Sequence, residues 1–140
     1  MALTARYLID TSAAARMHDL RVAALLAPLI EAGLVGTTAV LDAEALSSAR
    51  SPAEYERLWA DRRVAYEYLP TRDEHWQSAL AAQRTLARSG RHRAVGVSDL
   101  LTAVVAAEHR LTVVHYDADF ELAATVVPVE QVWVVPRGTV

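Results

Sequence analysis

The sequence predicts one α/β domain, spanning residues 1–140, in which helices cover both faces of a mostly parallel sheet. Short apolar segments of strand character alternate with longer segments of helical spacing along the chain, and this order of elements builds parallel sheets. Hydrophobic residues make up 53% of the 140 residues, which is enough for a substantial core. No repeat, linker or low-complexity segment divides the chain, so we expect a single domain.

The boundaries of the first three elements are clear. Residues 6–9 are apolar and predict a strand, and the side chains at 10–12 are suited to the N-cap of a helix beginning near Ala13. Leucines at helical spacing predict a second helix over 20–32, which Gly33 ends.

A second strand and two helices follow. Residues 34–37 predict a short strand, and Thr38 is a suitable cap for a helix from Ala39 to about Ala49. Another helix begins at 51–54, where a capping box carries proline at the first helical position.

The next unit begins with an alternating segment, 66–69, which predicts a third strand. A capping box at 71–74 opens a long helix that continues to about Ser89. Gly90 ends this helix, and residues 91–96 form a loop.

The last third of the chain contains the most apolar segments. Ser98 or Asp99 is expected to cap a helix that runs to Glu108 and is apolar on nearly every side, which implies burial. The apolar segments 111–116 and 132–135 predict two further strands.

Composition and charge exclude several classes of function. A net charge of −3 argues against a protein that coats nucleic acid through bulk positive charge. The chain has no cysteine, hence no disulfide or thiolate chemistry, and no lysine, which excludes a P-loop. The amino-terminal residues lack a signal-peptide pattern, and no apolar run is long enough to span a bilayer. We therefore expect a cytoplasmic protein that does not associate with membranes.

Acidic residues stand where strands end or helices begin. Asp10 and Asp117 each follow an apolar strand, so both should reach the edge of the sheet where parallel α/β folds bind ligands. Asp99 opens a buried helix, where a carboxylate suits the positive end of the helix dipole. Glu44 borders the inward face of its helix, whereas Asp42, two residues away, should point elsewhere.

Each of these carboxylates, taken alone, has an ordinary structural explanation as a helix cap, a turn residue or a solvated helix residue. Gathered at one edge of the sheet, they would repel one another and raise one another's pKa values. A hard divalent cation would relieve that repulsion. The sequence therefore predicts a metal site.

Four motifs follow one another along nearly the whole chain. Tyr7–Ser12 is Tyr-Leu-Ile-Asp-Thr-Ser, and a helix carrying Glu44 follows it. Ser98–Ala107 places an aspartate at the start of an apolar helix, and Val113–Phe120 joins a strand to an Asp-x-Asp-Phe turn. This ordered set resembles the PIN-domain ribonucleases, specifically the VapC-type toxins of toxin–antitoxin pairs.

The resemblance implies a PIN-like α/β/α sandwich and an endoribonuclease that hydrolyses RNA with a metal-activated water. It implies Mg²⁺, or Mn²⁺, as the cofactor, a homodimer, and a cognate antitoxin protein that holds the enzyme inactive. It assigns catalysis and metal binding to Asp10, Glu44, Asp99 and Asp117, with Asp119 as a further metal ligand. It also implies that Thr11 or Ser12 orients Asp10 or the metal-bound water by hydrogen bonds.

An acidic pocket repels RNA, so basic side chains are needed to attract it. Arginines cluster before Asp99, and another follows the first motif; the candidates for RNA binding are Arg16, Arg88, Arg91 and Arg93, with Arg84 and His92 beside them. The ordinary explanation is a solvated helix end whose basic residues complement the helix dipole. His115, on a presumed buried strand, is expected to be a hydrogen-bonded structural residue.

Two other functions stay open at this point. The chain could be a catalytically silent PIN-like binding module that acts through a protein partner. It could also be a housekeeping nuclease of RNA processing that has no antitoxin. Uptake of Mn²⁺ separates the first of these from a nuclease, because a silent module would bind little metal.

Overall fold

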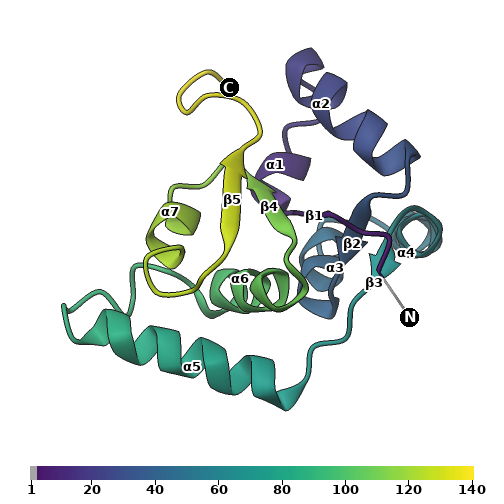
Figure 1. Cartoon of the computed structure of the whole chain (residues 1–140). Helices are drawn as coiled ribbons and strands as arrows, with labels where there is room; N and C mark the ends of the chain where they lie inside the picture. Colours follow the sequence, from purple (N-terminus) through teal and green to yellow (C-terminus); the bar gives the residue numbers. More distant parts are fainter. Residues whose placement is uncertain (1–2) are drawn as a thin grey trace.

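The computed structural model describes residues 3–140, and its strands form one all-parallel sheet in the order β3-β2-β1-β4-β5. The strands are β1 (Tyr7–Ile9), β2 (Val35–Thr37), β3 (Glu67–Tyr68), β4 (Thr112–His115) and β5 (Glu130–Trp133). The helices are α1 (Thr11–Ala14), α2 (Leu20–Glu31), α3 (Ala39–Leu46), α4 (Pro52–Ala65), α5 (Asp73–Ala87), α6 (Val97–His109) and α7 (Asp119–Ala123). The arrangement confirms the predicted α/β fold (Figure 1).

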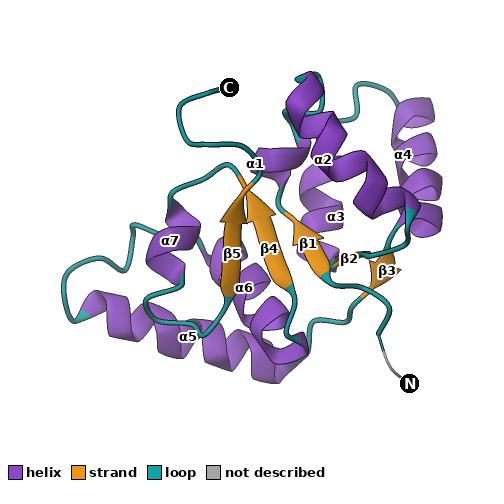
Figure 2. Ribbon diagram, turned by 45° about the horizontal axis from the view of Figure 1, so that its top comes forward, coloured by secondary structure: helices purple, strands orange, loops and turns teal. Residues whose placement is uncertain are grey.

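Helices cover both faces of this sheet because successive strand residues point to opposite sides (Figure 2). Leu8 and Val113 face one side, where they pack with buried residues of α3 and α6. Ile9 and Val114 face the other side and pack with Val22 and other residues of α1 and α2. Burial on both faces explains why the central strands β1 and β4 are short and mostly apolar, without polar alternation.

An outer helix, α5, lies against α6 rather than against the sheet (Figure 1). Its buried residues Ala79, Ala82 and Leu86 pack against α6 residues such as Leu101 and Val104. Because α6 is covered by the sheet on one side and by α5 on the other, it carries almost no polar residue in its middle turns.

The sheet order creates a switch point between β1 and β4. From β1 the chain builds outward through β2 and β3, and from β4 it builds in the opposite direction to β5. The two central strands are paired in parallel, with Ile9 opposite Val114, and the Asp10 amide donates to the Val114 carbonyl at 2.9 Å. In open parallel sheets the crevice beyond such a switch point is where ligands bind.

One helix, α7, was not expected. The segment 117–120 was predicted to be a turn, and an Asx-turn does form there, with the Asp119 amide donating to Asp117 Oδ1 at 2.9 Å. The chain then continues into α7, whose Phe120 is fully buried in the core. A helix of five residues is too short to show helical periodicity, so the sequence pattern did not reveal it.

The predicted cap of α6 was wrong. The helix begins at Val97 with Gly96 as its N-cap, and no side chain caps it, so neither Ser98 nor Asp99 has that role. Glycine is accepted at an N-cap almost as readily as polar residues are. Asp99 instead lies within the first turn, where its carboxylate is free for other contacts.

Several other boundaries differ from expectation by one to three residues, and three of them have a clear structural context. The long helix α5 starts at Asp73 with Arg72 as its N-cap, and its box uses His75 Nδ1, which accepts from the Arg72 amide at 2.9 Å. Strand β5 lies two residues before the predicted 132–135, because its partner β4 ends opposite Trp133. Helix α3 ends at Leu46, three residues earlier than predicted.

A buried ion-pair network fastens α4 to α3. Asp42 is 5% exposed, and its Oδ1 accepts from Thr37 Oγ1 and from Arg62 Nε, each at 2.8 Å. Arg63 approaches the other carboxylate oxygen at 3.4 Å. Asp42 thus faces away from the inward stripe of α3, as its helical phase predicts. Within residues 3–140, no helix has both the length and the apolar character needed to cross a membrane.

Asp42→Ala should lower the free energy of unfolding by about 3 kcal/mol, because it leaves the mostly buried Arg62 without its partner. Urea denaturation would measure the change. Asp61→Ala, at an exposed position of α4, is the matched control and should stay within about 0.5 kcal/mol of the wild type. Equal effects of the two substitutions would contradict the structural role of Asp42.

Candidate active site

Five carboxylates from four segments of the chain meet at the carboxyl ends of β1 and β4. One carboxylate oxygen from each of Asp99, Asp117 and Asp119 lies within 4.8 Å of the others. Asp10 and Glu44 are close enough for their charges to act on Asp99. The structure therefore brings together every acidic residue that the sequence pointed to for this site.

Ser12 connects Asp10 to the end of the neighbouring strand. The Asp10 side chain is almost fully buried, and its Oδ2 accepts from the Ser12 amide at 3.0 Å and from Ser12 Oγ at 2.6 Å. Ser12 Oγ in turn accepts from the Tyr116 amide at 2.9 Å. Of the two hydroxyl residues expected to orient Asp10, Ser12 makes the contact, while Thr11 makes no side-chain hydrogen bond within residues 3–140.

Asp99 experiences the strongest electrostatic effect in the cluster. Burial, together with repulsion from the other four carboxylates in the order Asp10, Asp117, Asp119 and Glu44, raises the pKa of Asp99 to about 7. A carboxyl group normally titrates near 4. At neutral pH the free cluster therefore cannot carry all of its negative charges without cost.

Glu44 and Asp119 are affected in the same direction. Burial, followed by the charge of Asp10, raises the pKa of Glu44, and burial followed by Asp117 raises the pKa of Asp119. Glu44 Oε1 is buried and has no hydrogen-bond partner within residues 3–140. A buried carboxylate oxygen without a partner is costly. An oxygen-only, negatively charged set of this kind fits a hard divalent cation such as Mg²⁺ or Mn²⁺.

His115 helps to position the site by binding the backbone of Asp117. It is fully buried at the end of β4, and its Nδ1 accepts from the Asp117 amide at 3.1 Å. Its Nε2 must then carry the proton, which it donates to Gln131 Oε1 at 2.6 Å. The ring also stacks on Phe120, with centroids 5.0 Å apart. The prediction of a hydrogen-bonded structural histidine is confirmed.

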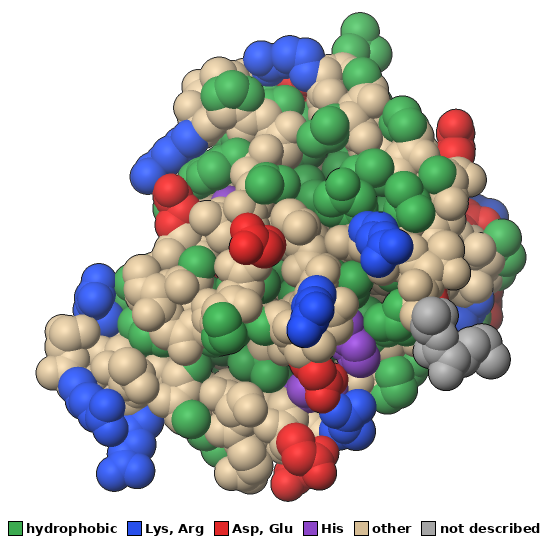
Figure 3. Space-filling model, viewed as in Figure 1, with side chains coloured by type: hydrophobic (Ala, Val, Ile, Leu, Met, Phe, Trp, Pro, Cys, Tyr) green, Lys and Arg blue, Asp and Glu red, His purple; other side chains and the backbone are tan. Residues whose placement is uncertain are grey.

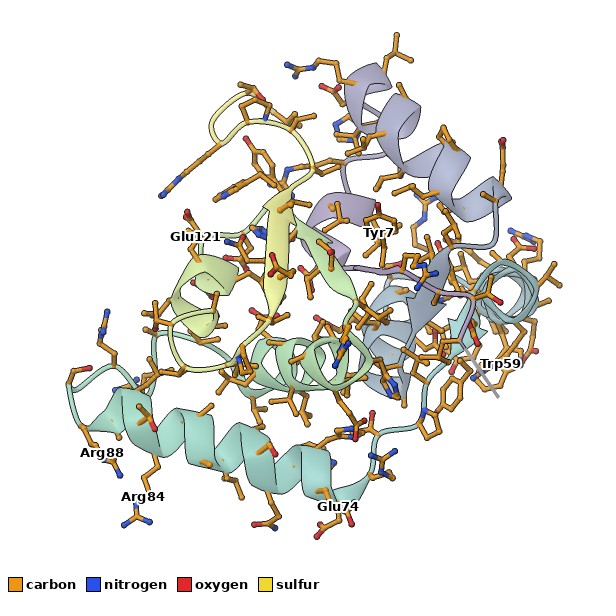
Figure 4. All side chains as sticks on the ribbon, viewed as in Figure 1. Tyr7, Trp59, Glu74, Arg84, Arg88 and Glu121 are labelled. Carbon is orange, nitrogen blue, oxygen red and sulfur yellow. The ribbon has the colours of Figure 1, made fainter. Side chains whose placement is uncertain are left out.

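The arginines predicted to bind RNA lie in two separate parts of the structure. Arg88, Arg91 and Arg93 are exposed at the end of α5 and in the loop before α6, where Figure 3 shows basic side chains gathered at the lower left and Figure 4 shows Arg84 and Arg88 pointing outward. Their role toward RNA stays a prediction. Arg16 lies beside the site, where its guanidinium stacks over the Tyr116 ring.

A second group of candidate metal ligands, His75, Glu108 and His109, lies at the opposite end of α6 from Asp99. The Arg72 amide donates to His75 Nδ1, so Nε2 carries the proton that it shares with Glu108 Oε2 at 2.6 Å. A metal-bound histidine has the reverse arrangement, in which the second ring nitrogen donates. This group therefore holds α5 against α6 and is not a metal site.

Comparisons with known proteins give one consistent family. The family model described as PIN domain matches residues 7–126. Ribonuclease VapC21 of Mycobacterium tuberculosis is 44% identical over 139 residues, covering 98% of this chain and 99% of the relative. Ribonuclease VapC51 of the same species is 41% identical over 136 residues, covering 96% and 97%.

Two solved structures of similar fold carry the VapBC name, and one of them is described as a member of the VapBC family of toxin-antitoxin systems. The structure of VapBC-5 from Mycobacterium tuberculosis has a TM-score of 0.60 and 28% identity, covering 91% of this chain and 98% of the matched chain. DNA-bound VapBC from Salmonella typhimurium has a TM-score of 0.72 and 17% identity, covering 94% and 99%. The second likeness shows the fold alone.

The metal-free protein should lose thermal stability as the pH rises from about 4 to about 7. Asp99 gives up its proton near pH 7 in the folded state but near 3.8 in the unfolded chain, so the folded state binds more protons within this window. The loss should be on the order of 1–2 kcal/mol once solvent screening of a half-buried group is included.

Asp99→Asn removes this titration, so its stability should depend less on pH and should exceed that of the wild type above pH 7. Scanning calorimetry in the presence of a chelator would measure both proteins. Asp61→Asn, outside the cluster, should follow the wild type. Parallel curves for the wild type and Asp99→Asn would contradict the electrostatic picture.

Proposed function

We propose that this chain, which belongs to the PIN-domain family, is the toxin of a VapBC-type pair and an endoribonuclease that depends on Mg²⁺ or Mn²⁺. The observation that carries the proposal is the convergence of five carboxylates, from segments far apart in sequence, at the switch point of the sheet. The ribonuclease names of relatives more than 40% identical over nearly the full chain support RNA as the substrate.

Each acidic residue has a role in this proposal. Asp10, Asp99, Asp117 and Glu44 hold the cation, and Asp119 is a further ligand. When bound, the cation supplies an activated water as nucleophile and neutralises charge on the scissile phosphate. Ser12 keeps the Asp10 carboxylate in one orientation through its two hydrogen bonds. Glu44 Oε1, without a partner within residues 3–140, is available to accept the proton that leaves the nucleophile.

The proposal includes two kinds of protein partner, a second copy of the chain and a cognate antitoxin. Large apolar side chains are exposed on two helices, Leu20 and Leu25 on α2 and Trp76 and Leu80 on α5. Exposed apolar groups of this size are typical of surfaces that contact other proteins. We place the protein in the cytoplasm, where its RNA substrate is found.

The purified chain should cleave RNA when Mg²⁺ or Mn²⁺ is present and lose this activity in a chelator. Asp99→Asn and Asp117→Asn should each reduce cleavage by about two orders of magnitude or more, because each removes a carboxylate that holds the cation. Calorimetric titration with Mn²⁺ should show uptake by the wild type and weak uptake by both variants. Asp61→Asn, an exposed acid elsewhere, should match the wild type.

Absence of both cleavage and Mn²⁺ uptake would contradict the proposal and favour a silent binding module. A different outcome would favour a housekeeping nuclease. In that case the protein binds metal and cleaves RNA, but co-expression of a small protein encoded by the neighbouring gene does not suppress cleavage.

Brief induction in cells should generate new RNA ends that are absent when Asp99→Asn is induced in the same way. Sequencing of RNA ends from the two cultures measures this difference and identifies the cleaved RNA. Identical sets of ends in both cultures would argue against an RNA target for the acidic cluster.

A further inference from the structure

We propose that Arg16 binds a backbone phosphate of the RNA strand beside the acidic cluster, and that Tyr116, fastened by residues 138–140, holds Arg16 in position. This inference rests on the function proposed above. It adds a positively charged side chain to a site whose other charged side chains are acidic. In the sequence alone, Arg16 is a candidate for RNA binding only because it follows the first motif. The structure supplies the contacts that argue for a defined role.

Arg16 is held next to two of the acids without touching either of them. Its Nη1 donates to the Ser12 carbonyl at 2.6 Å, and the Ser12 side chain is the one that binds Asp10. Its guanidinium carbon lies 4.3 Å from the centroid of the Tyr116 ring, and Tyr116 directly precedes Asp117. The guanidinium of Arg16 therefore lies beside the acidic cluster, between the chain segments that carry Asp10 and Asp117.

No carboxylate lies within salt-bridge distance of Arg16 in the described part of the chain. Two partly buried or half-exposed arginines of α4 differ in this respect, since Arg62 and Arg63 both pair with Asp42. Within residues 3–140, Arg16 donates one hydrogen bond, from Nη1 to the Ser12 carbonyl, and its other N–H groups donate none. An arginine held in this way has its planar fork available for a bidentate contact with a phosphate.

The ring beneath Arg16 is fixed by the carboxyl-terminal residues. The Tyr116 hydroxyl accepts from the Gly138 amide at 2.8 Å and from the Val140 amide at 3.1 Å. Arg21 Nη2 donates to the Thr139 carbonyl at 2.7 Å and so ties this segment to the start of α2. Trp133 packs edge-on against the Tyr116 ring, with centroids 5.4 Å apart.

This segment runs on from the carboxyl end of β5, at the end of the sheet where α1 begins (Figure 1). A ring with its hydroxyl anchored and its face occupied by a guanidinium has little freedom left. Arg16 therefore loses little conformational entropy when it binds an anion. Because a phosphate is the same in every nucleotide, the contact should contribute affinity for RNA without reading its sequence.

The test compares Arg16→Ala and Arg16→Lys with the wild type in two measurements. In cleavage assays with Mn²⁺, Arg16→Ala should raise KM about tenfold while kcat changes much less, as expected for the loss of one charged contact. In binding assays, a fluorescent single-stranded oligoribonucleotide of mixed sequence is titrated at several salt concentrations. The slope of log affinity against log salt should fall by about one for Arg16→Ala.

Two further variants separate positioning from charge. Arg16→Lys keeps the charge and should retain the salt slope, but it should only partly restore KM because lysine lacks the planar fork. Tyr116→Phe keeps the ring and removes the anchored hydroxyl, so it should raise KM less than Arg16→Ala does. Mn²⁺ affinity should be unchanged in all of these variants. Arg57→Ala, at an exposed position of α4, is the matched control and should leave KM and the salt slope unchanged.

Wild-type KM and salt slope in a folded Arg16→Ala protein would overturn the inference, even if the wild type cleaves RNA efficiently. A fall in thermal stability alone, with both values unchanged, would overturn it as well, since Arg16 would then act only in packing. If the wild type cleaves no RNA, the proposed function fails and the oligoribonucleotide titration decides the inference by itself. Should Arg16→Ala fail to fold, Arg16→Gln carries the same expectations.

Discussion

Repulsion among five carboxylates is the constraint around which the rest of this structure is organised. Asp99 is half-buried, near four other acids, and in the free protein its charged form is disfavoured up to about pH 7. The free energy that holds such a cluster together comes from elsewhere in the fold, above all from apolar residues packed on both faces of the central strands. Unfavourable electrostatic interactions that are confined to one site, in a fold whose other interactions favour the same structure, are typical of a functional centre.

Helix α3 shows how the fold separates charges that stabilise from charges that do not. Asp42 and Glu44 are two residues apart and face different directions. Asp42 is surrounded by partners, with Thr37, Arg62 and Arg63 on its two oxygens. Glu44 has no arginine within salt-bridge distance in residues 3–140, and the charge of Asp10 helps to raise its pKa. The difference supports a structural role for Asp42 and is consistent with the role proposed for Glu44 in the site.

The acids could be located from the sequence because each one is marked by a local pattern. Asp10 and Asp117 follow apolar runs that predict strands, and Glu44 follows from the period of a helix. Features without such a signal were missed. Helix α7 is too short to show a period, and Gly96 caps α6 without any side-chain contact. Val134 and Val135 are buried but lie beyond β5, so their apolar character shifted the predicted strand.

Contacts between a side chain and a distant backbone group were also outside the reach of sequence patterns. Nothing in the composition around Tyr116 indicates that its hydroxyl meets Gly138 and Val140, because tyrosine is common in strands and turns alike. The same holds for Arg16, whose neighbours are known only once α1 and β4 are placed side by side. Such contacts depend on tertiary geometry, which local propensities do not encode.

The hydroxyl of Ser12 connects the chain segments that follow β1 and β4. Where β1 and β4 stop pairing through their backbones, the next amide, that of Tyr116, is received by Ser12 Oγ instead of a carbonyl. The side chain acts as a spacer that lets the two segments diverge while their polar groups stay satisfied. The separation of these two segments at this point therefore depends on the length of the Ser12 side chain.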